Sequence, residues 1–447
     1  MPTKNTNYRF PFIAVTTLFF MWGFITVMVD ALIPRLKEVF ELEYWQASLV
    51  QMAWFTAYLL ISIPGGMLIS RVGYKRGILI GLGLMALGCV LFYPAAAVRT
   101  YGLFLAALFI LASGITILQV AANPYISVLG DMRGASSRLN LAQAFNSLGT
   151  TIAPILAAAY LLGDHIKNTD EINALEEVAK NAYFESEAAQ VQGPFLIIAL
   201  FILLLMGLFY LIKLPKIIDE KSDHSASSFL RALKHKPLML GAIAIFLYVG
   251  AEVAIGSWLT SYFMSLELHI VIQESSSLQA IVHFISKTFT GKDPSLLDPK
   301  GIVGSFVFFY WGGAMIGRFV GSLLTGIMQP SKVLAYFTLG AIALILISVS
   351  STGLLAMWTI IGVGLFNSIM FPTIFTLAIA GLGDLKPQGS GILCTAIFGG
   401  AIIPLITGLC FDLAGFGLGF AVLTLCYLFI LFYGRFISRN QIPPLQA

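Results

Sequence analysis

The stretch LMLGAIAIFLYVGAEVAIGSWLTSYF, residues 238–263, is almost uniformly apolar and contains one charged side chain, Glu252. A helix needs about 20 largely apolar residues to cross the hydrocarbon core of a bilayer, so this stretch is long enough to span it. Its length and uniformity favour a helix over the short alternating strands of a membrane barrel. Comparable stretches recur along the chain. They predict twelve spanning helices, at residues 10–33, 45–70, 77–97, 102–129, 138–162, 193–214, 237–266, 301–328, 332–350, 353–382, 387–411 and 416–437.

The composition indicates the same class of protein. Of the 447 residues, 58% are hydrophobic and 11% are charged, whereas an ordinary soluble domain has about 25% charged residues. A soluble chain of this length would not hide so much apolar surface from water. The sequence therefore predicts an all-α integral membrane protein that is multi-pass and surrounded by lipid.

Several other classes are disfavoured. The net charge of +4 includes no basic block typical of nucleic-acid binding. The four cysteines lie in apolar segments without the spacing of a disulfide framework or a metal site. The chain has no phosphate-binding glycine loop, metal signature or nucleophile–base pair. We therefore expect no cofactor, no structural metal and no enzymatic activity, and any transport would draw on an ion gradient.

Charge placement predicts the topology. Residues 214–236 are polar and basic, and they divide the predicted helices into two pseudo-symmetric halves of six, residues 8–213 and 237–438. Most of the 26 Lys and Arg residues face the cytoplasm if both termini are cytoplasmic, as the positive-inside rule requires. We therefore expect an inner (plasma) membrane protein. Residues 163–192 and 267–300 would then be external, either as solvated loops, the simpler expectation, or as short helices or a lid.

Two acids lie inside predicted helices, Asp30 and Glu252. A charge at bilayer depth costs about 2.5–3.5 kcal/mol on insertion scales, so such residues usually face a cavity or a partner. We expect no basic residue in the central part of a segment to pair with Glu252, whereas Arg35 is near enough in sequence to approach Asp30. This favours ion coupling by both acids over a purely structural role. The ion would be a proton, or Na⁺ held near Asp30 or Glu252 with amide or carbonyl oxygens.

Amide and hydroxyl side chains form a stripe along the predicted helix 138–162. Asn140, Gln143, Ser147 and Thr150 recur every three or four residues, and Asn146 adjoins them. Amides both donate and accept hydrogen bonds, which suits a polyol, although hydrogen bonding between packed helices would explain the stripe equally well. Aromatic rings inside the segments are candidates for stacking on a sugar, or for packing. The residues predicted to contact substrate are Gln119, Asn123, Gln143, Asn146, Asn367, Trp22, Tyr248 and Trp258.

One loop resembles a known superfamily motif. GGMLISRVGYKRG, residues 65–77, is similar to the loop motif of the major facilitator superfamily, with Ser70 where that motif usually has Asp and Tyr74 where it often has Arg. The resemblance implies the major facilitator fold of two six-helix halves. The charge network made by the missing Asp is not expected here.

Four further stretches resemble the L-fucose–proton symporter family. They are FFMWGFITVMVDALIP (19–34), ILQVAANPY (117–125), SSRLNLAQAFNSLG (136–149) and FLYVGAEVAIGSW (246–258). That family imports sugars by cation symport, usually with protons. The resemblance implies that Asp30 matches its helix-one acid for proton coupling and sugar binding. It likewise implies that Gln143 and Asn146 match amides near the sugar.

One departure concerns the second acid. The resemblance implies that Gln119 stands where the fucose branch of the family has a second essential Glu, and that Glu252 stands where that branch has a Gln. The resemblance thus implies that a carboxylate has moved from the fourth helix to the seventh. This pattern is more similar to the glucose/galactose and N-acetylglucosamine branch of the family than to the fucose branch.

The sequence therefore predicts a secondary active importer that couples inward movement of a monosaccharide to a proton gradient by alternating access. Asp30 and Glu252 would be the coupling groups. Sodium coupling and a sugar sensor that binds without transporting are the alternatives, and the amides disfavour export of apolar drugs. Family resemblance favours a monomer.

Overall fold

The computed structural model describes residues 8–30, 44–98, 100–160, 176–215, 226–290 and 293–440, which form helices and no strand. The first group comprises α1 (Arg9–Asp30), α3 (Tyr44–Val72), α4 (Tyr74–Val98), α5 (Tyr101–Val128), η1 (Met132–Gly134), α6 (Ala135–Tyr160) and α8 (Glu177–Leu211). The second comprises α9 (Ala226–Leu233), α10 (Lys236–Ser265), α11 (Leu268–Glu274), α12 (Ser276–Ile285), η2 (Ser286–Thr290), η3 (Pro294–Leu296), α13 (Pro299–Gly304), α14 (Val307–Ile327), α15 (Pro330–Val349), α16 (Gly353–Asn367), α17 (Met370–Ile379), η4 (Gly383–Leu385), α18 (Lys386–Thr395), η5 (Ala396–Phe398) and α19 (Gly399–Asn440).

Within the described residues, ten helical runs are long and apolar enough to cross a membrane. The 26-residue α6 is not among them, because it carries the polar stripe. The last run, Gly383–Asn440, leaves helical geometry at Ala414 and at Gly415, where φ is 74°. A positive φ is a conformation that glycine adopts readily, so the chain can turn here between two helical stretches. The membrane class is confirmed, and the count of twelve spans stays a prediction.

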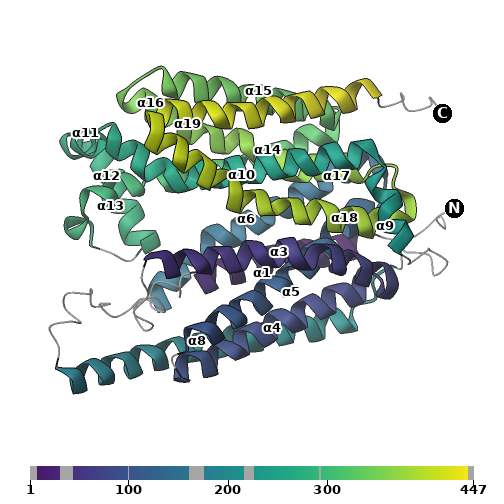
Figure 1. Cartoon of the computed structure of the whole chain (residues 1–447), viewed down its shortest axis with the longest axis horizontal. Coiled ribbons are helices and arrows are strands. Elements are labelled where there is room, and N and C mark those ends of the chain that lie inside the picture. Colours follow the sequence, from purple (N-terminus) through teal and green to yellow (C-terminus); the bar gives the residue numbers. More distant parts are fainter. Residues whose placement is uncertain are drawn as a thin grey trace.

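The helices fall into two groups in chain order (Figure 1). In the first, α4 packs on α5 and α1 on α6; in the second, α10 packs on α19 and α15 on α16. The groups meet where α6 packs on α14 and α17 and where α18 packs on α3 and α5. The predicted division into halves at residues 8–213 and 237–438 stays a prediction, and residues 216–225 of the predicted linker lie outside the described residues.

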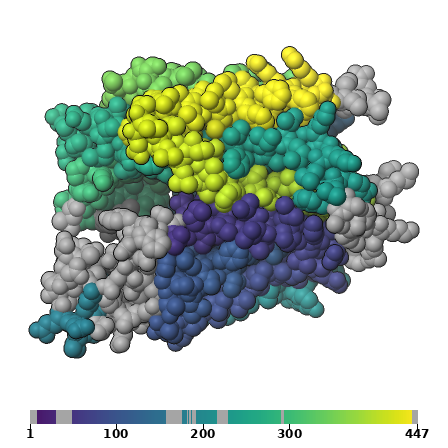
Figure 2. Space-filling model, viewed as in Figure 1, coloured from purple at the N-terminus to yellow at the C-terminus, as the bar shows by residue number. Residues whose placement is uncertain are grey.

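One end of the boundary between the groups is closed. The hydroxyls of Ser136 on α6 and Thr376 on α17 lie 2.6 Å apart. α3 and α18 approach closely because Gly66 and Gly391 face each other's helix, and a Cβ at either would collide with backbone atoms. Figure 2 shows the atoms of α3, in purple, packed directly against the yellow-green atoms of the α18–α19 region. This end is the one that positive-inside topology predicts to be cytoplasmic.

The connection at 267–300 is folded, so the simpler expectation of a solvated loop is wrong there. Its described residues form α11, α12, η2, η3 and α13, and apolar side chains such as Leu268, Ile272 and Val282 are buried. Burial of apolar residues three or four positions apart stabilises short helices that would not persist alone. In the other external connection, α8 begins at Glu177, earlier than the predicted 193, and residues 161–175 lie outside the described residues.

Candidate substrate and ion-coupling site

A cavity of about 800 Å³ lies between the two groups of helices. Its walls come from α1 and α6 on one side and from α12, η2, α13 and α14 on the other. The α6 wall carries Asn146, Ser147, Thr150, Thr151 and Pro154, and the α14 wall carries Phe308, Trp311, Gly312, Ala314 and Arg318. A concave space of this size with a few convergent polar groups is typical of a small-molecule site.

The floor of this cavity is formed by Ser147 and Arg318, the lining pair nearest the closed end. Beyond them, Ser137 on α6 and Ser322 on α14 already touch, with their hydroxyl oxygens 3.3 Å apart. Among the described lining residues, Arg318 is the only charged one. The cavity extends from this floor toward α12 and α13, and contacts between the groups block it below Arg318.

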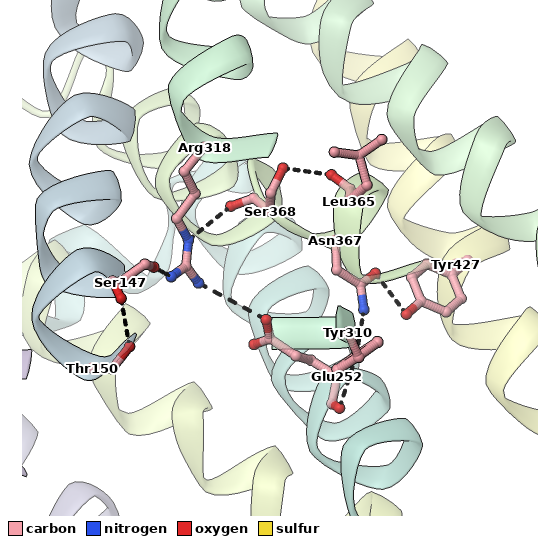
Figure 3. Close-up of polar contacts among 9 residues, drawn as sticks. All are labelled: Ser147, Thr150, Glu252, Tyr310, Arg318, Leu365, Asn367, Ser368 and Tyr427. Atoms are coloured by element: carbon pink, nitrogen blue, oxygen red, sulfur yellow. Dashed lines mark hydrogen bonds and ion pairs between the residues drawn. The ribbon is translucent and has the colours of Figure 1, made fainter. Parts of the chain in front are cut away.

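Arg318 has three partners (Figure 3). Its Nε donates to the backbone oxygen of Ser368 at 3.2 Å, and its Nη1 donates to the Ser147 hydroxyl across the boundary. Its Nη2 lies 3.9 Å from Oε1 of Glu252. The expectation that no basic residue would pair with Glu252 is wrong. Arg318 precedes the end of α14 at Ile327 by nine residues, or about 13 Å of helix, so it lies well inside the segment.

Glu252, on α10, is only loosely paired. Its side chain is 13% exposed and that of Arg318 is 16% exposed. Charge-assisted hydrogen bonds from Arg to carboxylates have N–O distances of about 2.7–2.9 Å, so 3.9 Å is too long for one. Within the described part of the chain, Oε1 of Glu252 accepts no hydrogen bond. The carboxylate is thus near a cation yet still free to take up a proton.

A chain of hydrogen bonds supports the backbone at Glu252. The Tyr310 hydroxyl donates to the backbone oxygen of Glu252 at 3.1 Å, Asn367 Nδ2 donates to that hydroxyl at 2.9 Å, and Tyr427 donates to Asn367 Oδ1 at 2.7 Å. Asn367 is fully buried, and the described cavity lining does not include it. The structure therefore gives Asn367 neighbours that fix α10, α14, α16 and α19 relative to one another.

The predicted amides of the first group lie at different depths. Asn146 lines the cavity, and its Nδ2 donates to the backbone oxygen of Phe19 at 2.9 Å. Gln143 lies 3.5 Å from Asn123 Oδ1, and Gln119 donates to the Tyr58 hydroxyl. These last three amides are buried between α3, α5 and α6, and Asn123 Nδ2 has no partner among the described residues.

The three predicted aromatic contacts lie away from the described cavity lining. Trp22 packs against Phe19 with ring centroids 5.5 Å apart, and Trp258 donates from Nε1 to the Pro404 carbonyl at 3.4 Å. Tyr248 is buried one turn before Glu252. Trp311 instead lines the cavity and is 46% exposed.

Asp30 is the last residue of α1, one turn beyond the cavity-lining Val27, and its side chain lies outside the described residues. Its coupling role stays a prediction. No group of three or more His, Cys, Asp or Glu residues in the described part of the chain is placed to hold a metal ion.

Residues 11–403 match the sequence model of the Major Facilitator Superfamily. A glucose/galactose transporter of Brucella abortus is 45% identical over 98% of this chain and 96% of its own length. The L-fucose–proton symporter of Escherichia coli is 34% identical over 98% of this chain and 95% of its own. The crystal structure of the superfamily transporter FucP in an outward conformation matches 97% of this chain and all of its own, with a TM-score of 0.85 and 34% identity. This chain belongs to the Major Facilitator Superfamily.

Proposed function

We propose that this chain imports a monosaccharide by proton symport and alternating access. The observation that carries the proposal is the cavity between two helical groups, with Arg318 at its floor and the Glu252 carboxylate 3.9 Å beyond. A binding space closed at one end by contacts between the groups suits rocking about a central site. A carboxylate whose exposure changes with that motion can carry a proton.

The relatives support a sugar as the substrate and a proton as the coupling ion. Proteins named glucose/galactose transporter are more similar to this chain, at 45% identity, than the L-fucose–proton symporter at 34%. Gln119 and Glu252 stand in place of the residues expected for the fucose branch. This also favours the glucose/galactose transporters over the fucose symporter as a guide to the substrate. We therefore propose glucose or galactose as the first substrates to test.

The cavity suggests which side chains meet the sugar in this state. Asn146, Thr150 and Thr151 offer polar groups from one wall, and Trp311 offers a ring from the other. The buried Gln119, Asn123 and Gln143, with Trp22, Tyr248 and Trp258, would meet it only after rearrangement. The bonds of the buried Asn367 to Tyr310 and Tyr427 favour a structural role over the predicted sugar contact. Asp30 and Glu252 remain the proposed coupling acids.

The proposed orientation places the cavity on the external side and both termini in the cytoplasm. The positive-inside pattern of the loops supports this, as do the contacts between the groups at the end away from α12 and α13. Because the cavity is built from one chain, we propose that the monomer is the transporting unit.

Uptake into proteoliposomes tests the proposal. Purified protein is reconstituted, and accumulation of labelled glucose, galactose and fucose is followed under an inward pH gradient without sodium, then under a sodium gradient at fixed pH. We expect accumulation of glucose or galactose with the pH gradient, and its loss with a protonophore. Accumulation with sodium alone would favour the sodium symporter. Sugar binding without counterflow would favour a sensor.

A further inference from the structure

Arg318 is held by both halves of the molecule. The bond from Nε to the Ser368 carbonyl ties the guanidinium to its own half, whereas the bond from Nη1 to Ser147 ties it to α6 of the other half. Only Nη2 points toward Glu252, at 3.9 Å from Oε1 (Figure 3). The arginine is therefore shared between an uncharged hydroxyl across the boundary and a carboxylate in its own half.

This sharing limits the ion pair. A guanidinium carries five N–H donors in a rigid planar fork, and its strongest contact with a carboxylate uses two parallel N–H groups. In this structure one terminal nitrogen is engaged by Ser147, so the fork does not close on Glu252. The backbone oxygen of Ser147 accepts from the hydroxyls of Thr150 and Thr151 at 2.8 Å, so its own hydroxyl is the group that faces Arg318.

The other groups near Glu252 in the described part of the chain are phenols, and the hydroxyl of one of them, Tyr248, is directed at the carboxylate. Tyr248 on its own helix, Tyr310 on α14 and Tyr427 on α19 face the carboxylate, and phenols ordinarily ionise near pH 10. The hydroxyls of Tyr310 and Tyr427 are already used in the chain through Asn367. In the described part of the chain, Arg318 is thus the charged group that faces Glu252.

We propose that Ser147 is a positioning residue. Its contact with Arg318 determines whether the Glu252 carboxylate binds a proton or forms a close ion pair with Arg318. This rests on the proposed function. While Ser147 holds Nη1, Glu252 accepts a proton from the open cavity. When the halves rock, Ser147 and Arg318 separate because they belong to opposite halves. The freed fork then pairs with Glu252, whose O–H bond breaks, and the proton passes to water on the inner side. Arg318 stays positively charged throughout, so one proton crosses per cycle at this site.

The external pH dependence of uptake tests this inference. Without the Ser147 hydroxyl, Arg318 is free to close on Glu252 even in the outward state, and a higher proton concentration is needed to displace it. We expect Ser147→Ala to move the external pH of half-maximal uptake to the acidic side by about one unit, a tenfold change in proton concentration. Sugar counterflow at equal pH on both sides is measured in the same variant to separate any effect on sugar binding from the pH shift, and Ser147→Thr is expected to restore the profile.

Ser137→Ala is the matched control. It removes another serine contact between α6 and α14, to Ser322, without touching a charged group. Its pH profile is expected to match wild type. An unchanged profile in Ser147→Ala, or an equal shift in Ser137→Ala, would overturn the inference. If Ser147→Ala is poorly retained in the membrane, Ser147→Cys replaces it, because the thiol is a weaker hydrogen-bond acceptor. Ser147→Cys is expected to show the same acidic shift. An unshifted pH profile in Ser147→Cys would overturn the proposal equally. Failure of wild type to use a pH gradient would instead refute the proposed function.

Discussion

Glu252 on α10 and Arg318 on α14 face each other across 3.9 Å beneath the cavity, while the hydrogen bonds of the arginine go to Ser147 and Ser368. An isolated charge in this position would be costly, and the arginine offsets part of that cost. It does so without the short contacts of a permanent ion pair. The relationship therefore explains how the chain tolerates an intramembrane acid and still keeps it available for a proton.

The pair should be coupled in stability. Removal of one partner of a buried ion pair leaves an uncompensated charge and costs about 3–5 kcal/mol, whereas removal of both can be nearly neutral. We expect Arg318→Gln to lower the melting temperature of the purified protein and the double variant Arg318→Gln/Glu252→Gln to recover most of the loss. Additive effects in this double-mutant cycle would show that the residues do not interact.

Asn367 is expected to act through the position of Glu252. Asn367→Ala would remove the acceptor of the buried Tyr427 hydroxyl and the donor to the Tyr310 hydroxyl, at a cost of about 1–3 kcal/mol. We expect lower thermal stability and a lower maximal uptake rate, with little change in the sugar concentration for half-maximal uptake. Tyr427→Phe, which unpairs Asn367 Oδ1, should behave similarly. A large loss of sugar affinity with normal stability would place Asn367 in the sugar site instead.

Trp311 is expected to contact the sugar, since it lines the cavity and is 46% exposed. Trp311→Ala should weaken sugar binding about tenfold, by loss of about 1.4 kcal/mol of stacking and apolar contact. The measurement is equilibrium binding of glucose or galactose, with Leu323→Ala, on the outer surface of the same helix, as the control. Equal affinities in wild type and Trp311→Ala would assign the ring to packing.

The closed end should open during transport. The Ser136 and Thr376 hydroxyls lie 2.6 Å apart across the boundary, so cysteines at both positions are close enough to form a disulfide. We expect oxidation of Ser136→Cys/Thr376→Cys to stop uptake while external sugar binding persists, and reduction to restore uptake. Each single cysteine variant controls for the native cysteines. Normal uptake by the cross-linked protein would contradict alternating access at this interface.

The sequence predicted the class and most helices because long apolar runs follow directly from the thickness of the bilayer. It also identified Glu252, since position alone makes an intramembrane acid conspicuous. Arg318 was missed, although it lies inside the predicted segment 301–328. The sequence does not show which neighbours the side chain of a residue meets, and only the course of α14 past α6 shows that Arg318 faces the cavity.

The direction of the side chains is the other feature that the sequence could not predict. Spacing places Gln143, Asn146, Ser147 and Thr150 on one helix, but the neighbours of that helix decide which of them reach the cavity. Asn146, Ser147 and Thr150 do so, while Gln143 turns toward Asn123 on α5. Likewise, the burial of α11–α13 depends on packing against α10, α14 and α16, which no local pattern specifies.

The most direct test of the account is proton-driven accumulation by Glu252→Gln in proteoliposomes, measured beside sugar counterflow. A glutamine keeps the shape of the side chain but cannot release a proton. The account predicts that wild type accumulates glucose or galactose under an inward pH gradient, while Glu252→Gln exchanges the sugar at equal pH but does not accumulate it. Accumulation by Glu252→Gln at the wild-type level would contradict the central claim that this carboxylate couples the proton to the sugar.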